Sequence, residues 1–113
     1  MVRLLIFSGR PDPQWSLDAD EAEGLAERLA ESVGREKIHP PPLAGLGYRG
    51  FRLILTEQGP TEFVVYRSVV TENPGRAEVY WRDVGRVERW LLDDARRRGY
   101  GDLLDATKAG EED

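Results

Sequence analysis

Continuous apolar runs, and runs in which apolar and polar residues alternate, predict four β-strands along the chain. The first run, Val2–Phe7, is apolar apart from Arg3, which is typical of a central strand covered on both faces. The segment 62–71 has the highest β-propensity, and the turn signal Asn73-Pro74-Gly75 follows it. The four predicted strands are residues 2–7, 51–56, 62–71 and 77–81.

Two other segments place apolar residues at helical spacing. Residues 19–33 form the first predicted helix, because Asp18 is a suitable N-cap and Glu21 completes a capping box. Residues 84–98 form the second, between Asp83 as the N-cap and Gly99 as the C-terminal stop. The expected inner positions are Ala22, Leu25, Ala26, Leu29 and Val33 in the first helix, Val84, Val87, Leu91 and Ala95 in the second, and Leu103 and Leu104 in one further turn.

The predicted order of elements is therefore β-α-β-β-β-α. This order favours an α+β two-layer sandwich, in which a mostly antiparallel sheet carries both helices on one face. The pattern leaves open whether the first two strands run parallel or antiparallel. A chain of 113 residues has the size of one domain, which we assign to residues 1–107, and residues 108–113 are expected to form a flexible acidic tail.

Composition and charge narrow the classes of function. The formal net charge of −5 opposes binding to nucleic acid, which depends on clustered positive charge. The chain has no cysteine, which excludes disulfides, thiolate nucleophiles and cysteine-bound metals. No stretch approaches the ~20 apolar residues of a membrane span, and the start does not resemble a signal peptide, so we expect a cytoplasmic protein without membrane contact.

The segment most informative about function lies between the first strand and the first helix, at residues 8–15. Two prolines stiffen it, while Ser8, Arg10, Asp12 and Trp15 supply a hydroxyl, a guanidinium, a carboxylate and an indole. Such groups on a rigid loop favour a surface that contacts a partner. The alternatives are a connection whose indole folds onto the edge of the core, and a small-anion site at the helix N-terminus.

A second loop has the letters of a dinucleotide-binding motif, Gly-Leu-Gly-Tyr-Arg-Gly at residues 45–50. That motif binds pyrophosphate where its glycines follow a strand and open a helix. Here they follow Pro40-Pro41-Pro42 and precede a strand, so no nucleotide cofactor is expected. The loop is either a plain glycine-rich turn or a turn that displays Tyr48 and Arg49 as contact residues.

The second predicted helix has arginines opposite its apolar side, with Trp90 at the margin between the two sides. This side is either a solvated surface whose arginines pair with neighbouring acids or, since tryptophan and arginine are enriched at binding hot spots, a docking surface for an acidic protein with Trp90 as its anchor. A third alternative is an RNA-binding surface. The arginines are Arg82, Arg86, Arg89, Arg96 and Arg97.

Neither catalysis nor metal binding is predicted from the spacing of the reactive residues. His39 is the single histidine, and no nucleophile-elbow pattern surrounds Ser8. The acids between residues 12 and 21 match no metal-binding loop, and Asp18 and Glu21 already have a capping role. We expect no catalytic residue, no bound metal and no cofactor.

The function that fits these observations is binding without catalysis. We expect a small module that binds a protein partner, or a second copy of itself, through the proline-stiffened loops. Self-association through Phe63–Val70 is a further option if that strand lies at a sheet edge. The alternative is a small-molecule or anion binder, or a minor enzyme, with a pocket between loops 8–15 and 43–50. The expected contact residues are Ser8, Arg10, Asp12, Trp15, Tyr48, Arg49 and Trp90.

Overall fold

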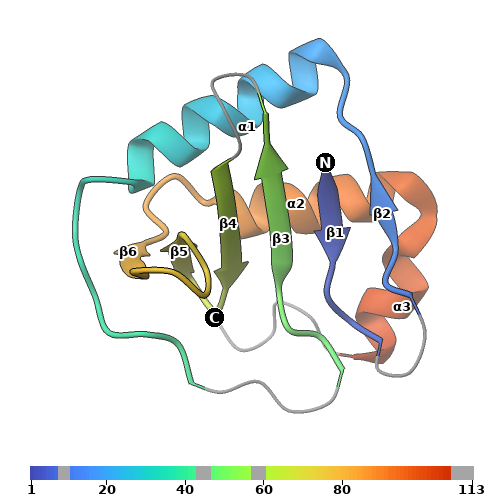
Figure 1. Ribbon diagram of the computed structural model, residues 1–113. Coiled ribbons are helices and arrows are strands. Elements are labelled where there is room, and N and C mark those ends of the chain that lie inside the picture. The colour runs from blue at the N-terminus through green and yellow to red at the C-terminus, as the bar shows by residue number, and fades with distance from the viewer. Residues whose placement is uncertain (8–10, 43–46, 57–60, 108–113) are drawn as a thin grey trace.

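The computed structural model describes residues 1–7, 11–42, 47–56 and 61–107, which form an antiparallel sheet packed against helices (Figure 1). The strands lie in the order β2-β1-β3-β4-β5-β6. Their bounds are β1 (Val2–Leu4), β2 (Gln14–Trp15), β3 (Phe51–Leu55), β4 (Thr61–Tyr66), β5 (Val69–Glu72) and β6 (Val79–Arg82). The helices are α1 (Ala19–Ser32), α2 (Val87–Ala95) and α3 (Gly101–Ala106); α2 and α3 are joined by the turn η1 (Arg96–Tyr100), where Gly99 kinks the chain with a left-handed φ of 98°.

The α+β two-layer arrangement predicted from the sequence is confirmed. In Figure 1 the sheet lies in front, and α1 and α2 both lie behind it. Strand β1 pairs with β3 in the antiparallel sense, which resolves the orientation that the sequence left open. Because these two strands are antiparallel, the segment after β1 and the segment before β3 meet at the same end of the sheet.

One hydrophobic core joins the two layers. Across the inner face of the sheet, Val2 lies opposite Leu53, and Leu53 lies opposite Phe63, so these three side chains form one row facing the helices. Leu25 of α1 and Leu91 of α2 are fully buried against this face. Leu104 is also fully buried, as the sequence predicted for the final turn.

The long predicted strand at residues 62–71 is instead a hairpin of β4 and β5. Arg67 and Ser68 form its turn with left-handed φ values of 50° and 64°, the conformation that a two-residue hairpin loop requires. Both strands lie inside the sheet, between β3 and β6. The option of self-association through Phe63–Val70 at a sheet edge is therefore wrong.

The outer side of β6 is occupied by the segment that follows α1. The Ile38 N–H donates to the Tyr80 carbonyl at 3.1 Å, and the Arg82 N–H donates to the Glu36 carbonyl at 2.9 Å. Lys37 forms an isolated antiparallel bridge with Trp81 between these two bonds. This segment thus extends the hydrogen-bonded ladder by one short element beyond β6.

Helix α1 begins as predicted, whereas α2 begins later than predicted. The Asp18 carboxylate accepts from the Glu21 N–H at 2.8 Å, and Glu21 returns the bond to the Asp18 N–H at 2.9 Å. The N-cap residue of α2 is Arg86, so the prediction of Asp83 at that position is wrong, although the Asp83 carboxylate accepts from the N–H groups of Val87 and Glu88, at 2.7 and 2.9 Å, across an intervening turn.

That intervening turn brings Gly85 against the backbone of α1. A Cβ atom at Gly85 would lie 2.2 Å from the Arg28 carbonyl oxygen, so only glycine fits at this position. The turn also leaves Val84 outside the helix, where it is 53% exposed. The expectation that Val84 is an inner residue is therefore wrong.

Candidate functional site

The side chains of the predicted contact residues Asp12 and Arg49 bind backbone groups of the segment that follows β1. The Asp12 carboxylate accepts from the Ile6 N–H at 3.0 Å and from the Phe7 N–H at 2.7 Å. The Arg49 guanidinium donates to the Phe7 carbonyl at 2.8 Å and lies 3.9 Å from the Asp12 carboxylate. The structure therefore brings the two loops together, as the antiparallel pairing requires. Ser8 and Arg10 lie outside the described residues.

Tyr48 points into the protein, so the interpretation that it is displayed on a loop is wrong. Its side chain is buried among Phe51 and Tyr66, with ring centroids 6.0 and 5.8 Å away. Its hydroxyl lies 2.5 Å from the Glu88 carboxylate, which is itself 3% exposed. Because a buried carboxylate requires hydrogen-bond donors, this contact accounts for the inward position of the phenol.

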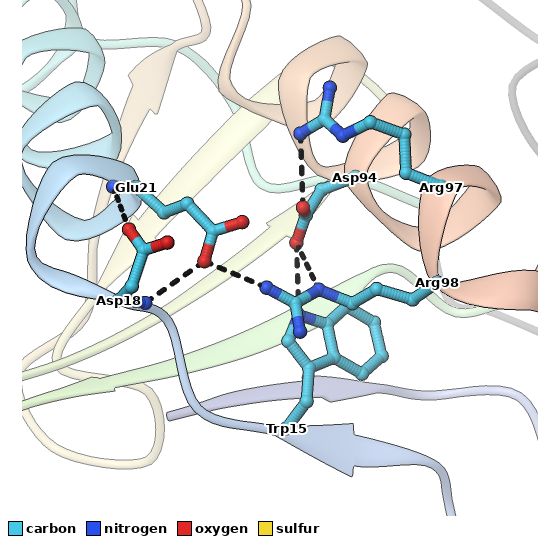
Figure 2. Close-up of polar contacts among 6 residues, drawn as sticks. All are labelled: Trp15, Asp18, Glu21, Asp94, Arg97 and Arg98. Carbon is cyan, nitrogen blue, oxygen red and sulfur yellow. Dashed lines mark hydrogen bonds and ion pairs between the residues drawn. The ribbon is translucent and has the colours of Figure 1, made fainter.

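Trp15 belongs to a polar cluster centred on Asp94, which Figure 2 shows in close-up. The Asp94 carboxylate is 1% exposed and accepts from the Trp15 indole, from Arg97 and from Arg98, each at 3.0 Å. The Trp15 ring stacks on Tyr100 with a centroid separation of 5.4 Å. The alternative of an indole folded onto the edge of the core therefore describes Trp15 better than a free contact residue.

The same cluster continues to the N-terminus of α1 (Figure 2). Arg98 donates to Glu21 at 2.9 Å, and Glu21 also completes the capping box with Asp18. Partial burial alone lowers the pKa of Arg98, but the hydrogen bonds and negative charges of Asp94 and Glu21 outweigh it and raise the pKa overall. Arg98 therefore stays charged and links the start of α1 to the end of α2.

Trp90 is half-buried at the contact between α1 and α2. A Cβ atom added to Gly24 of α1 would lie 3.9 Å from the indole nitrogen of Trp90. Two of the arginines predicted on the second helix are paired but lie outside α2: Arg96 of η1 contacts Asp105 at 2.8 Å, and Arg82, which ends β6, contacts Glu36 at 2.5 Å. The alternative of a solvated and partly paired side thus fits these arginines.

A hollow of about 420 Å³ lies between the polyproline segment 40–42 and the outer face of the sheet. Arg49, Arg52 and Tyr80 contribute to its lining. Both guanidiniums already have acceptors, because Arg52 contacts Glu62 at 2.7 Å and Arg49 contacts the Phe7 carbonyl. This arrangement weakens the case for an anion site, and neither Trp15 nor Tyr48 lines the hollow.

A larger groove of about 490 Å³ lies between α1 and the neighbouring ends of strands β3 and β4. We call it the α1 groove. Its lining is mostly apolar, and the only described polar side chains in it are hydroxyls. It is lined by Met1, Ser16, Leu17, Ala22, Ala26, Leu29, Ala30, Val33, Ile54, Leu55, Thr56, Thr61 and Phe63.

The α1 groove was missed by reasoning from the sequence alone. Ala26 was expected inside the core, yet it is exposed, and Ala30 beside it is exposed as well. Ala22, Ala26 and Ala30 recur at intervals of four residues, so they form one row along the helix. This row was the available signal, because alanine side chains are too short to close the space between the helix and the strand ends.

Comparison with known proteins adds no further evidence, since no protein family, curated protein or solved structure matches this chain. Within the described ranges, no helix is long and apolar enough to cross a membrane. Over the same ranges, no three histidine, aspartate or glutamate side chains gather as metal ligands.

Proposed function

We propose that this chain is a binding module that docks an apolar segment of a protein partner in the α1 groove. The observation that carries the proposal is the groove itself, an open and mostly apolar hollow of about 490 Å³. Ligand sites fall in the range of roughly 300–1,000 Å³ and combine apolar walls with a few polar groups. Thr56, Thr61 and Ser16 supply such polar groups here.

The groove is a better docking surface than the loops that the sequence first suggested. Within the described part of those loops, Asp12 and Arg49 contact backbone groups of the same chain, and Tyr48 is buried. The side chains lining the groove have no comparable polar contacts to break. A partner therefore gains apolar burial in the groove without displacing hydrogen bonds.

A peptide-display selection tests the proposal. Random peptides are selected on the wild-type protein and then measured on Ala26→Arg, which places a long charged side chain in the groove. The matched control is Ala106→Arg, because Ala106 is also an exposed helical alanine but does not line the groove. We expect selected peptides to bind wild type and the control and to lose at least about tenfold in affinity on Ala26→Arg. Equal binding to all three proteins would overturn the proposal.

A second copy of this chain is the other partner that the sequence suggests. Light scattering after size-exclusion chromatography separates the two cases. A dimer that dissociates in Ala26→Arg and persists in Ala106→Arg indicates that the groove receives another copy. A monomer at every concentration, together with peptide binding, indicates a different protein partner.

A further inference from the structure

We infer that the partner segment in the α1 groove is a basic amphipathic helix, an inference that rests on the proposed binding role of the groove. Three observations support it: the charge along the rim, the shape of the walls and the charge of the other candidate occupants.

One rim of the groove is acidic. Glu23, Glu27 and Glu31 are exposed on α1 and lie beside the row of alanines, since Glu23 and Glu27 each neighbour an alanine three positions further on. Among the described residues, these three carboxylates have no hydrogen-bond or ion-pair partner. A segment bound along α1 would therefore meet three available negative charges beside an apolar floor.

Among the described residues, the charged group on the opposite wall is the ammonium of Met1, which donates to the Ile54 carbonyl at 2.9 Å. Ile54, Leu55 and Thr56 form part of this wall, and the nearby Glu62 alternates to the outer face, where it pairs with Arg52 at 2.7 Å. Within the described part of the chain, the unpaired negative charge beside the groove therefore lies on its α1 side. Lysine and arginine on one flank of a partner helix would complement it.

The walls favour a helix over an extended strand. The strands that border the groove, β1, β3 and β4, are internal, so their backbone groups are already paired within the sheet. An extended peptide would have no free sheet edge to join there. A row of alanines lets a second helix approach closely, because the distance between helix axes depends on the side chains at the contact.

The length of the groove sets the size of the partner segment. Among the lining residues of α1 and its C-cap, Ala22 is the first and Val33 the last, eleven positions apart. At about 1.5 Å per residue this distance is roughly 17 Å, or about three helical turns. A helix of that length presents apolar anchors at positions i, i+3 or i+4, and i+7.

The other occupants that the chain suggests carry the wrong charge. Residues 108–113 contain Lys108 but also Glu111, Glu112 and Asp113, so this tail is acidic. Nucleic acids and anionic membranes are also negative and would be repelled by the acidic rim. A basic segment of another protein is the occupant that the charge favours.

The test uses a blocked, fluorescent probe peptide of about three helical turns, with leucines on one face and lysines on the other. Its partner probe keeps the leucines and replaces every lysine with glutamate. Fluorescence anisotropy measures both on wild type, Ala26→Arg and the double variant Glu23→Lys/Glu27→Lys. The charge-matched control is Asp93→Lys/Asp102→Lys, at exposed positions that do not line the groove.

We expect the lysine probe to bind wild type and the control about tenfold more tightly than the glutamate probe, with the difference shrinking at high salt. The double variant should reverse this preference, and Ala26→Arg should weaken both probes. Equal binding of both probes, sensitive to Ala26→Arg, would overturn the basic partner while supporting the groove. Insensitivity to Ala26→Arg would overturn the groove itself. Failure of the lysine probe to bind wild type would also overturn the inference of a basic partner. The peptide selection would then test independently whether the groove is a docking site.

Discussion

The indole of Trp15 donates a 3.0 Å hydrogen bond to the carboxylate of Asp94, which lies 79 residues later in the chain. The same carboxylate accepts from Arg97 and Arg98, so one buried side chain joins β2 to the end of α2. Strand β2 contains only two residues, Gln14 and Trp15. Its position therefore depends on this tertiary contact as well as on its pairing with β1.

Replacing Asp94 with alanine is expected to lower the free energy of unfolding by about 3 kcal/mol, because three donors lose a buried acceptor. Urea unfolding followed by fluorescence measures the change. Arg97→Gln is the control, since its side chain is 61% exposed and its loss is expected to stay below about 1 kcal/mol. An Asp94→Ala protein as stable as the control would contradict the proposed role of this carboxylate.

Replacing Tyr48 with phenylalanine is expected to destabilise the protein by about 1–3 kcal/mol, because the buried Glu88 carboxylate loses its hydroxyl donor. The comparison is Tyr80→Phe, whose hydroxyl contacts the exposed Glu78 and whose loss should change stability much less than loss of the Tyr48 hydroxyl. Chemical denaturation of both variants checks the difference. Equal effects would mean that burial of Glu88 does not depend on Tyr48.

Two glycine-to-alanine substitutions are expected to have opposite effects. Gly85→Ala places a methyl group 2.2 Å from the Arg28 carbonyl and should cost about 3 kcal/mol or more. Gly24→Ala lies inside α1, where the new methyl would be no closer than 3.9 Å to Trp90, and should stabilise by about 0.5–1 kcal/mol. Thermal unfolding of both variants tests the pair, and a stable Gly85→Ala protein would disprove the close helix contact.

The Glu78 carboxylate is expected to titrate below the ordinary pKa of a glutamate. The Tyr80 hydroxyl, first, and the Gly75 N–H, second, both donate to the charged form and lower this pKa. Since the folded pKa is depressed, the associated stabilisation is present above the unfolded pKa and disappears as pH falls through the folded one. Carboxyl NMR titration should show the Glu78 midpoint rising in Tyr80→Phe, and an unchanged midpoint would exclude the hydroxyl as the main cause.

The sequence predicts the elements whose signals are local. The capping residues Asp18 and Glu21 and the helical spacing locate α1 to within one residue at each end. The turn at Arg67 and Ser68 was missed because neither residue is a usual occupant of left-handed backbone. β2 was missed because a two-residue strand exists only through its partner, and that pairing has no signature in sequence.

The candidate site was harder to predict, because it depends on how the two layers meet. Two charged residues of α2 are buried: Glu88, which directly follows the inner residue Val87, and Asp94, which lies seven positions after Val87. A charged residue seven positions after an inner one was a detectable sign of a buried polar cluster. The four-residue spacing of Ala22, Ala26 and Ala30 is visible in the sequence, but it does not tell an exposed alanine from a core alanine, so the α1 groove can be located only once the position of the strands beside α1 is known.

The segment that runs along β6 also affects the behaviour of the molecule in concentrated solution. An uncovered strand at the margin of a sheet is a template for cross-β growth, since its backbone groups recruit further chains. Glu36 and Ile38 occupy such groups on β6, and at the other margin β2 offers only two residues. Fibril formation is therefore expected to require prior detachment of the 36–38 segment.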